Sequence, residues 1–151
     1  MFVRYEEHID RGFEDVLEEF VSPAHEWVPD LADDPTAGTS FVRSELGTGV
    51  VAKEVKMYVR EAFVRPDRAV IPLRVVATGP AGLFPELDAD LELVADGDDT
   101  CTLVLQGTYR IPFGHVGELL DRALLHGLRE ASLRNFIRDV AEILRRKVVA
   151  A

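Results

Sequence analysis

The sequence contains very little cysteine and no long uninterrupted hydrophobic run. Its one cysteine, Cys101, has no second cysteine in the chain with which to form a disulfide. No window holds the roughly 18 consecutive apolar residues that a membrane-spanning helix needs. The N-terminal segment also lacks the basic start and apolar core of a secretory signal. These absences favour a soluble, cytoplasmic protein without a membrane span.

Positive charge is scarce as well. The chain has 17 lysines and arginines against 27 acidic residues, which gives a net charge of −10. Because proteins bind the phosphate backbone mainly through lysine and arginine, nucleic acid is not an expected partner. The acidic surplus is concentrated in residues 1–34, where eleven acids accompany only Arg4 and Arg11. Such a face could bind a partner protein, although a solvated helix surface is the simpler interpretation.

The spacings of common metal and catalytic sites are missing. The four histidines are scattered without the spacing of a zinc site, and no Gly-x-Ser-x-Gly elbow or phosphate-binding glycine loop occurs. Cys101 lies in an alternating apolar segment, which is typical of an unreactive core thiol. We therefore expect neither a metal nor a cofactor.

A long amphipathic helix is the strongest positive signal, over residues 115–151. Apolar residues recur there at spacings of three and four, no proline interrupts the pattern, and arginines become frequent toward its end. A helix of this length needs a broad apolar surface to cover its stripe. The strand-like segments of residues 40–111 supply that surface.

Alternating apolar and polar residues predict six strands, separated by turn signals. A first short helix, capped by Asp10, and a second one after Pro23 that carries Trp27 are expected between strands one and two. The fold class is therefore α+β, with residues 1–151 forming one domain in which a curved antiparallel sheet grips a long C-terminal helix. The expected strands span residues 2–9, 40–46, 51–64, 69–78, 87–95 and 100–111.

Acidic residues occur in two kinds of position on these strands. Glu86, Asp88, Asp90 and Glu92 alternate with apolar residues, mostly leucines, so their side should face solvent. Glu61 instead interrupts the apolar side of its strand, as Glu7 does less clearly. A buried carboxylate must be paired or shift its pKa, which makes Glu61 a candidate acid or base.

Small residues line the face of the long helix that should meet the sheet. Ala123, Gly127 and Ala131 follow one another at intervals of four. Such a ridge either lets the helix backbone touch the sheet or leaves room for a ligand. Both interpretations stay open on the sequence.

The order of elements and three segments resemble the START-like, or helix-grip, superfamily, which includes bacterial polyketide cyclases and plant Bet v 1-type proteins. The segments are LFPELDADLEL at 83–93, TYRIPFG at 108–114 and LLDRALLHGLREASLRNFIRDVAEIL at 119–144. The resemblance implies a hydrophobic ligand between sheet and helix, and in some members cyclisation or dehydration there. It also implies a seventh strand, which we expect near residues 40–51.

The first functional hypothesis is binding of a small hydrophobic molecule, such as a lipid, polyketide or aromatic compound, by a monomer or homodimer. The second is a metal-independent cyclase or dehydratase that uses Glu61 or Tyr109 as the acid or base, and the third is an interaction module that uses the acidic N-terminal face. The expected pocket lining is Trp27, Met57, Val59, Glu61, Leu73, Leu91, Leu105, Tyr109, Ala123 and Gly127.

Overall fold

The computed structural model describes the backbone of residues 2–27, 31–34, 39–45, 52–77, 86–110 and 122–150. Side chains are described at 2–24, 26–27, 57–75, 86–108, 110 and 133–148. No helix in these ranges is both long enough and apolar enough to cross a membrane.

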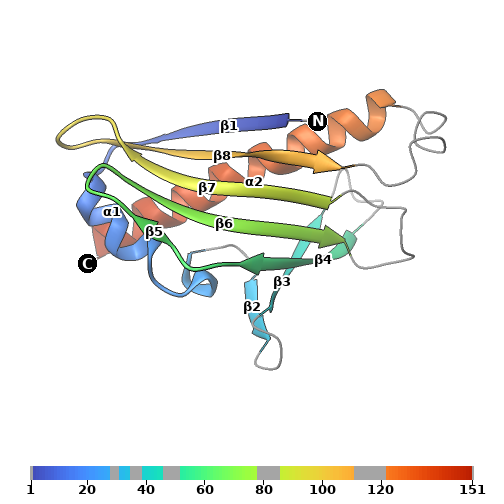
Figure 1. The fold of residues 1–151 in the computed structure, drawn as a ribbon, viewed down its shortest axis with the longest axis horizontal. Coiled ribbons are helices and arrows are strands. Elements are labelled where there is room, and N and C mark those ends of the chain that lie inside the picture. The colour runs from blue at the N-terminus through green and yellow to red at the C-terminus, as the bar shows by residue number, and fades with distance from the viewer. Residues whose placement is uncertain are drawn as a thin grey trace.

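The described strands form one curved sheet in which every pairing is antiparallel (Figure 1). The strand order is β1-β8-β7-β6-β4-β3-β2, and β5 pairs with β6 beside β4. The strands are β1 (Phe2–Ile9), β2 (Leu31–Asp34), β3 (Thr39–Glu45), β4 (Ala52–Val59), β5 (Phe63–Val64), β6 (Arg68–Ala77), β7 (Glu86–Ala95) and β8 (Cys101–Arg110).

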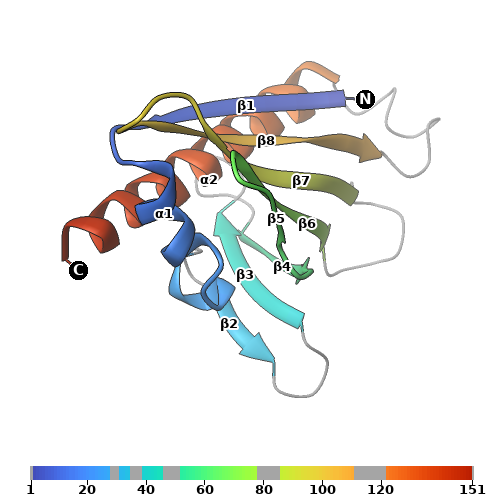
Figure 2. The same ribbon diagram turned by 60° about the vertical axis from the view of Figure 1, so that its left-hand side comes forward.

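The helices lie on one face of this sheet, which we call the inner face; the opposite face is the outer face. α1 (Phe13–Phe20) and the 3₁₀ turn η1 (Ala24–Glu26) follow β1. α2 (Arg122–Ala150) crosses the inner face diagonally, and its C-terminal end lies beside α1 (Figures 1 and 2). This arrangement confirms the helix-grip architecture expected from the sequence. The expected beginning of the long helix, residues 115–121, lies outside the described residues.

The strand expected at 51–64 is divided by a β-bulge. Val59 pairs with Leu73 and Phe63 pairs with Val70, so three residues (60–62) on this side face two (71–72) on β6. The backbone N–H of Arg60 still donates to the Pro72 carbonyl oxygen at 3.0 Å. Because one extra residue reverses the alternation beyond it, every later side chain moves to the opposite face.

Two further expectations about local structure were wrong. The additional strand is β2, which lies N-terminal to the region of 40–51 where we expected it. Asp10 does not cap the first helix, because α1 begins only at Phe13 and its N-cap is Gly12, without a side-chain cap. The Asp10 carboxylate instead lies 3.1 Å from the Arg11 guanidinium and 3.8 Å from that of Arg145.

Candidate ligand site on the inner face

The strand register lines up apolar side chains in rows across the inner face. One row runs through Met57, Val75 and Leu87. The next runs through Val59, Leu73, Ala89, Gly107 and Val3. Antiparallel neighbours directly opposite each other point to the same side, so the alternation along each strand becomes a continuous apolar surface.

The solvent exposure of this surface changes along the strands. On β6, the exposed fraction rises from 0% at Ala69 to 3% at Ile71 and 5% at Leu73, and Val75 is only half-buried. On β7, Leu93 is fully buried, whereas Ala89 keeps 7% of its surface exposed. The inner face is thus slightly less buried toward the end of the sheet that carries the half-buried Val75 and Gly107, and Leu87 at this end is 4% exposed. We call this end the open half and the other end the closed half.

Side chains from both helices fill the closed half. Ile137, Val140, Ala141 and Leu144 of α2 are essentially inaccessible and belong to one buried cluster with the β7 and β8 side chains and with α1. Trp27 seals the α1 end: its ring stacks on Phe20 with 5.5 Å between centroids, and its Nε1 donates to the Ser22 carbonyl oxygen at 3.0 Å. No ligand is needed to complete this half.

The contacts of α2 with the sheet are concentrated on two of its strands. The helix packs mainly against β1, β8 and α1. Its side chains at Leu133 and Phe136 are half-buried; Leu133 lies about one turn before Ile137 and Phe136 directly precedes it. β4, β6 and β7 lie beyond β8 in the sheet, so their apolar inner side chains extend past the strands that α2 contacts most.

The structure divides the expected pocket lining between the two halves. Met57, Val59 and Leu73 lie in the open half. Leu91 and Leu105 are fully buried in the closed half, where Trp27 also lies. Met57 and Leu73 belong to the same buried cluster as these three residues, and the half-buried Val59 packs against it.

Glu61 does not face the interior, contrary to expectation. It is exposed, because the bulge turns it away and places the half-buried Ala62 on the inner side instead. The argument for Glu61 as a buried acid or base therefore fails. The side chains of Tyr109, Ala123 and Gly127 lie outside the described part; by register, Tyr109 stands opposite Leu87.

The expected lining omits five residues of the open half: Val3, Val75, Leu87, Ala89 and Gly107. Each stands at an alternating position within one of the expected strands, so the alternation could have found them. What the sequence does not reveal is the cross-strand register that brings them into the same rows as Leu73 and Met57.

The described inner side chains of the open half are all apolar. Cys101 lies in the closed half, where burial raises the pKa of its thiol to about 12, with a smaller contribution from the charge of Asp96. No group of three or more histidine, cysteine, aspartate or glutamate residues that could hold a metal occurs among the described residues.

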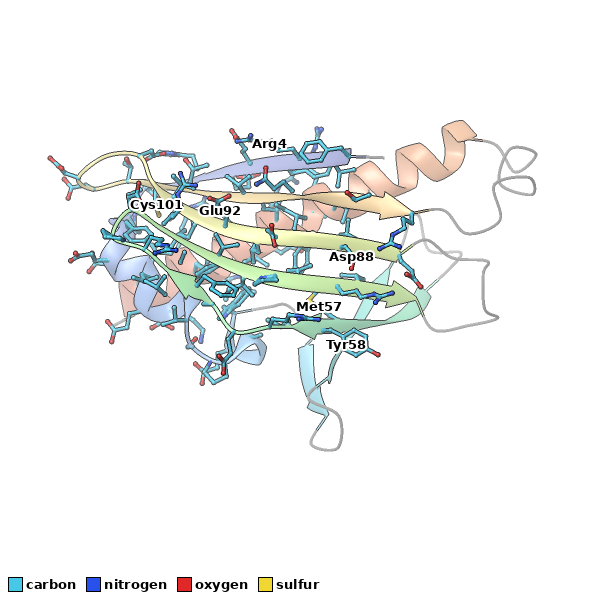
Figure 3. The ribbon with its side chains drawn as sticks, in the orientation of Figure 1. Arg4, Met57, Tyr58, Asp88, Glu92 and Cys101 are labelled. Atoms are coloured by element: carbon cyan, nitrogen blue, oxygen red, sulfur yellow. The ribbon has the colours of Figure 1, made fainter. Side chains whose placement is uncertain are left out.

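The acids of β7 lie on the outer face, as Figure 3 shows for Asp88 and Glu92. Arg74 contacts Glu86 at 2.8 Å and Asp88 at 3.7 Å, and Arg110 contacts Asp88. Glu92 departs from the expected solvated pattern because it is 8% exposed, lying 3.2 Å from Arg68. These ion pairs offset the negative charge of the β7 acids on the outer face. None of these acids faces the inner apolar surface.

Comparison with known proteins supports the fold alone. The sequence matches no protein-family model and no curated protein. Solved structures with a similar fold include a conserved protein from Geobacillus kaustophilus (TM-score 0.63, 11% identity, covering 99% of this chain and 96% of that one). They also include the Zhui aromatase/cyclase from Streptomyces sp. R1128 (TM-score 0.58, 15% identity, covering 98% of this chain and 95% of that one). A third is norcoclaurine synthase from Thalictrum flavum (TM-score 0.57, 12% identity, covering 100% of this chain and 87% of that one). The chain therefore has the helix-grip fold that these proteins share.

Proposed function

We propose that this protein binds a small hydrophobic molecule between α2 and the open half of the inner face. One observation carries the proposal: the exposed fraction along β6 increases from Ala69 to Val75 while the side chains stay apolar. The half-buried Val59 and Val75 keep part of their apolar surface in contact with water, which is unfavourable. An apolar ligand would cover it.

The small residues of the open half support the same proposal. Ala89 and Gly107 lie side by side on the inner face, next to Leu73 and Val3. The small side chain of Ala89 leaves space above the sheet where a larger side chain would otherwise stand, and Gly107 places no side chain beside it. The solved structures named above include two enzymes, an aromatase/cyclase and a synthase, which shows that the fold can accommodate small-molecule chemistry.

A paired substitution tests this site. Val75 and Val94 are both half-buried valines, but Val75 faces inward and Val94, opposite Arg68, faces outward. Val75→Trp should fill the open half and weaken binding of a fluorescent apolar probe at least about tenfold, the effect expected when a large side chain occupies a ligand site. Val94→Trp should leave probe binding unchanged.

Equal probe binding by wild type and both variants would contradict the proposal. Native mass spectrometry of freshly purified wild-type protein provides an independent readout, since a co-purified apolar compound should be present and should be depleted in Val75→Trp. Cyclase or dehydratase activity stays an alternative, with Tyr109 as the candidate acid or base. Tyr109→Phe would then abolish turnover without reducing ligand binding.

A further inference from the structure

Exposed apolar side chains are concentrated on β4 and β5. Among the described residues, the large hydrophobic side chains with substantial exposure are Phe2, Val21, Tyr58, Phe63 and Val64. Tyr58 stands opposite Arg74 and Phe63 opposite Val70, so both lie on the outer face, which Figure 3 shows for Tyr58. Phe63 is 67% exposed although Val70 beside it is half-buried. Tyr58 and Phe63 stand opposite residues four apart on β6, with Pro72 between them, and we call the outer surface around Tyr58, Pro72 and Phe63 the outer patch. Exposed aromatic residues are enriched at protein interfaces.

A hollow of about 430 Å³ adjoins this patch on the outer face. Arg60 and Pro72 line it on the side of the patch, and Asp90 and Gln106 line the other side. Neither Arg60 nor Asp90 forms an ion pair within the described part of the chain, whereas their neighbours Arg74 and Asp88 pair with each other at 3.7 Å. The hollow thus carries one unpaired charge of each sign.

The presence of one unpaired positive and one unpaired negative charge in the hollow indicates which kind of partner can bind there. A polyanionic partner would be attracted by Arg60 but repelled by Asp90, and a polycationic partner would meet the reverse. A surface that offers both signs is complementary to itself. The chain carries a net charge of −10, so two copies should approach most easily where the surface is locally neutral and apolar. We propose that a second copy of this chain docks on the outer face of β4, β6 and β7.

The strand order makes the charge pairing reciprocal. β4 and β7 flank β6 on its two sides, and Arg60 and Asp90 both stand beside Pro72 on β6. A two-fold axis parallel to β6 therefore places Arg60 of one copy over Asp90 of the other, and Asp90 of the first over Arg60 of the second. In this arrangement Pro72 and Val70 lie at the centre of the interface between the two copies, and Tyr58 and Phe63 lie at its flank.

Sedimentation velocity over a protein dilution series is the first test. The wild type should show a concentration-dependent dimer, and Phe63→Ser should weaken dimerisation at least about tenfold, as expected for an aromatic interface residue. Phe2→Ser is the matched control, since Phe2 is also 67% exposed but lies on β1, away from the patch. It should dimerise like the wild type.

Charge reversal tests the reciprocal pairing. Arg60→Glu and Asp90→Arg should each be largely monomeric alone, because each then places like charges against one another. An equimolar mixture of the two variants should recover dimers. In the mixed dimer the introduced glutamate faces the introduced arginine, and the unaltered Asp90 of one copy faces the unaltered Arg60 of the other. Both positions are exposed, so neither change threatens the fold.

Four outcomes would overturn the proposal. One is a monomeric wild type at concentrations up to about 1 mM. Another is a dimer that Phe63→Ser and Phe2→Ser weaken equally, or that the mixture of charge variants does not restore. The last is a monomer that binds phosphatidylserine vesicles in a Phe63-dependent manner, which would assign the patch to a membrane surface instead.

Discussion

Gly107 lies directly opposite Ala89 in the sheet, and the two backbones approach so closely that no side chain fits at position 107. A Cβ atom there would lie 2.5 Å from the Ala89 Cα and 2.7 Å from its Cβ, and closer still to the Asp88 carbonyl oxygen. Contacts this short with backbone atoms cannot be relieved by rotating a side chain. Glycine at 107 therefore permits the close approach of β7 and β8 beneath the proposed ligand site.

Replacing this glycine should destabilise the fold. We expect Gly107→Ala to lower the free energy of unfolding by about 1–3 kcal/mol or more, because β7 and β8 must separate to admit the methyl group. Denaturant unfolding monitored by circular dichroism measures the change. Gly12→Ala is the control: its Cβ would lie 3.4 Å from the nearest atom, an Asp15 carboxylate oxygen, so its cost should be no more than about 1 kcal/mol. Equal costs at the two positions would refute the close-approach argument.

The bulge between β4 and β5 leads to a second prediction. Glu61→Ala should change the free energy of unfolding by no more than about 0.5 kcal/mol, because the side chain is exposed. Ala62→Glu should cost about 1–3 kcal/mol, because it places a carboxylate on the inner face next to Ile71. Thermal melting of the two variants side by side distinguishes the positions. A large loss for Glu61→Ala with a small one for Ala62→Glu would mean that the strand continues without the bulge.

The buried thiol provides a pH-dependent prediction. Burial raises the pKa of Cys101 to about 12, whereas an unfolded cysteine ionises near pH ~8.5. The unfolded state therefore loses its thiol proton first, and stability should fall as the pH rises from about 8.5 toward 12. The Cys101→Ala variant should lack this contribution to the fall in stability at alkaline pH.

Thiol labelling measures the same burial directly. A thiol reagent at about pH 8 should modify native protein far more slowly than denatured protein, because Cys101 is fully buried. Rapid labelling of the native protein would contradict the position of Cys101 in the closed half.

The sequence predicted the fold because the three-and-four spacing of the helix and the alternation of the strands are clear over most of the chain. Along β6, β7 and β8 the alternation is unbroken, so the inward positions of Leu73, Leu91 and Leu105 were predicted correctly. The alternation failed at Glu61 because neither glycine nor proline marks the extra residue of the bulge. β2 was missed because Asp33 and Asp34, followed by proline, have the composition of a turn.

The candidate site was less predictable than the fold. Whether an inward leucine lines a ligand space or fills a core depends on what lies above it, and a strand sequence does not contain that information. Leu73 and Leu91 have the same pattern of neighbours, yet Leu91 belongs to the closed half and Leu73 to the open half. The cover above a strand comes from other elements, such as α2, which packs against β1, β8 and α1.

The central claim is that the open half binds an apolar ligand and the closed half does not. Methyl-resolved NMR during titration with an apolar fluorescent probe tests it most directly, since it locates the bound probe along the inner face. The methyl signals of Leu73, Val75 and Leu87 should shift with probe concentration, while those of Leu93 and Leu144 stay in place. Shifts confined to the closed half, or no shifts at all at saturating probe, would contradict the account.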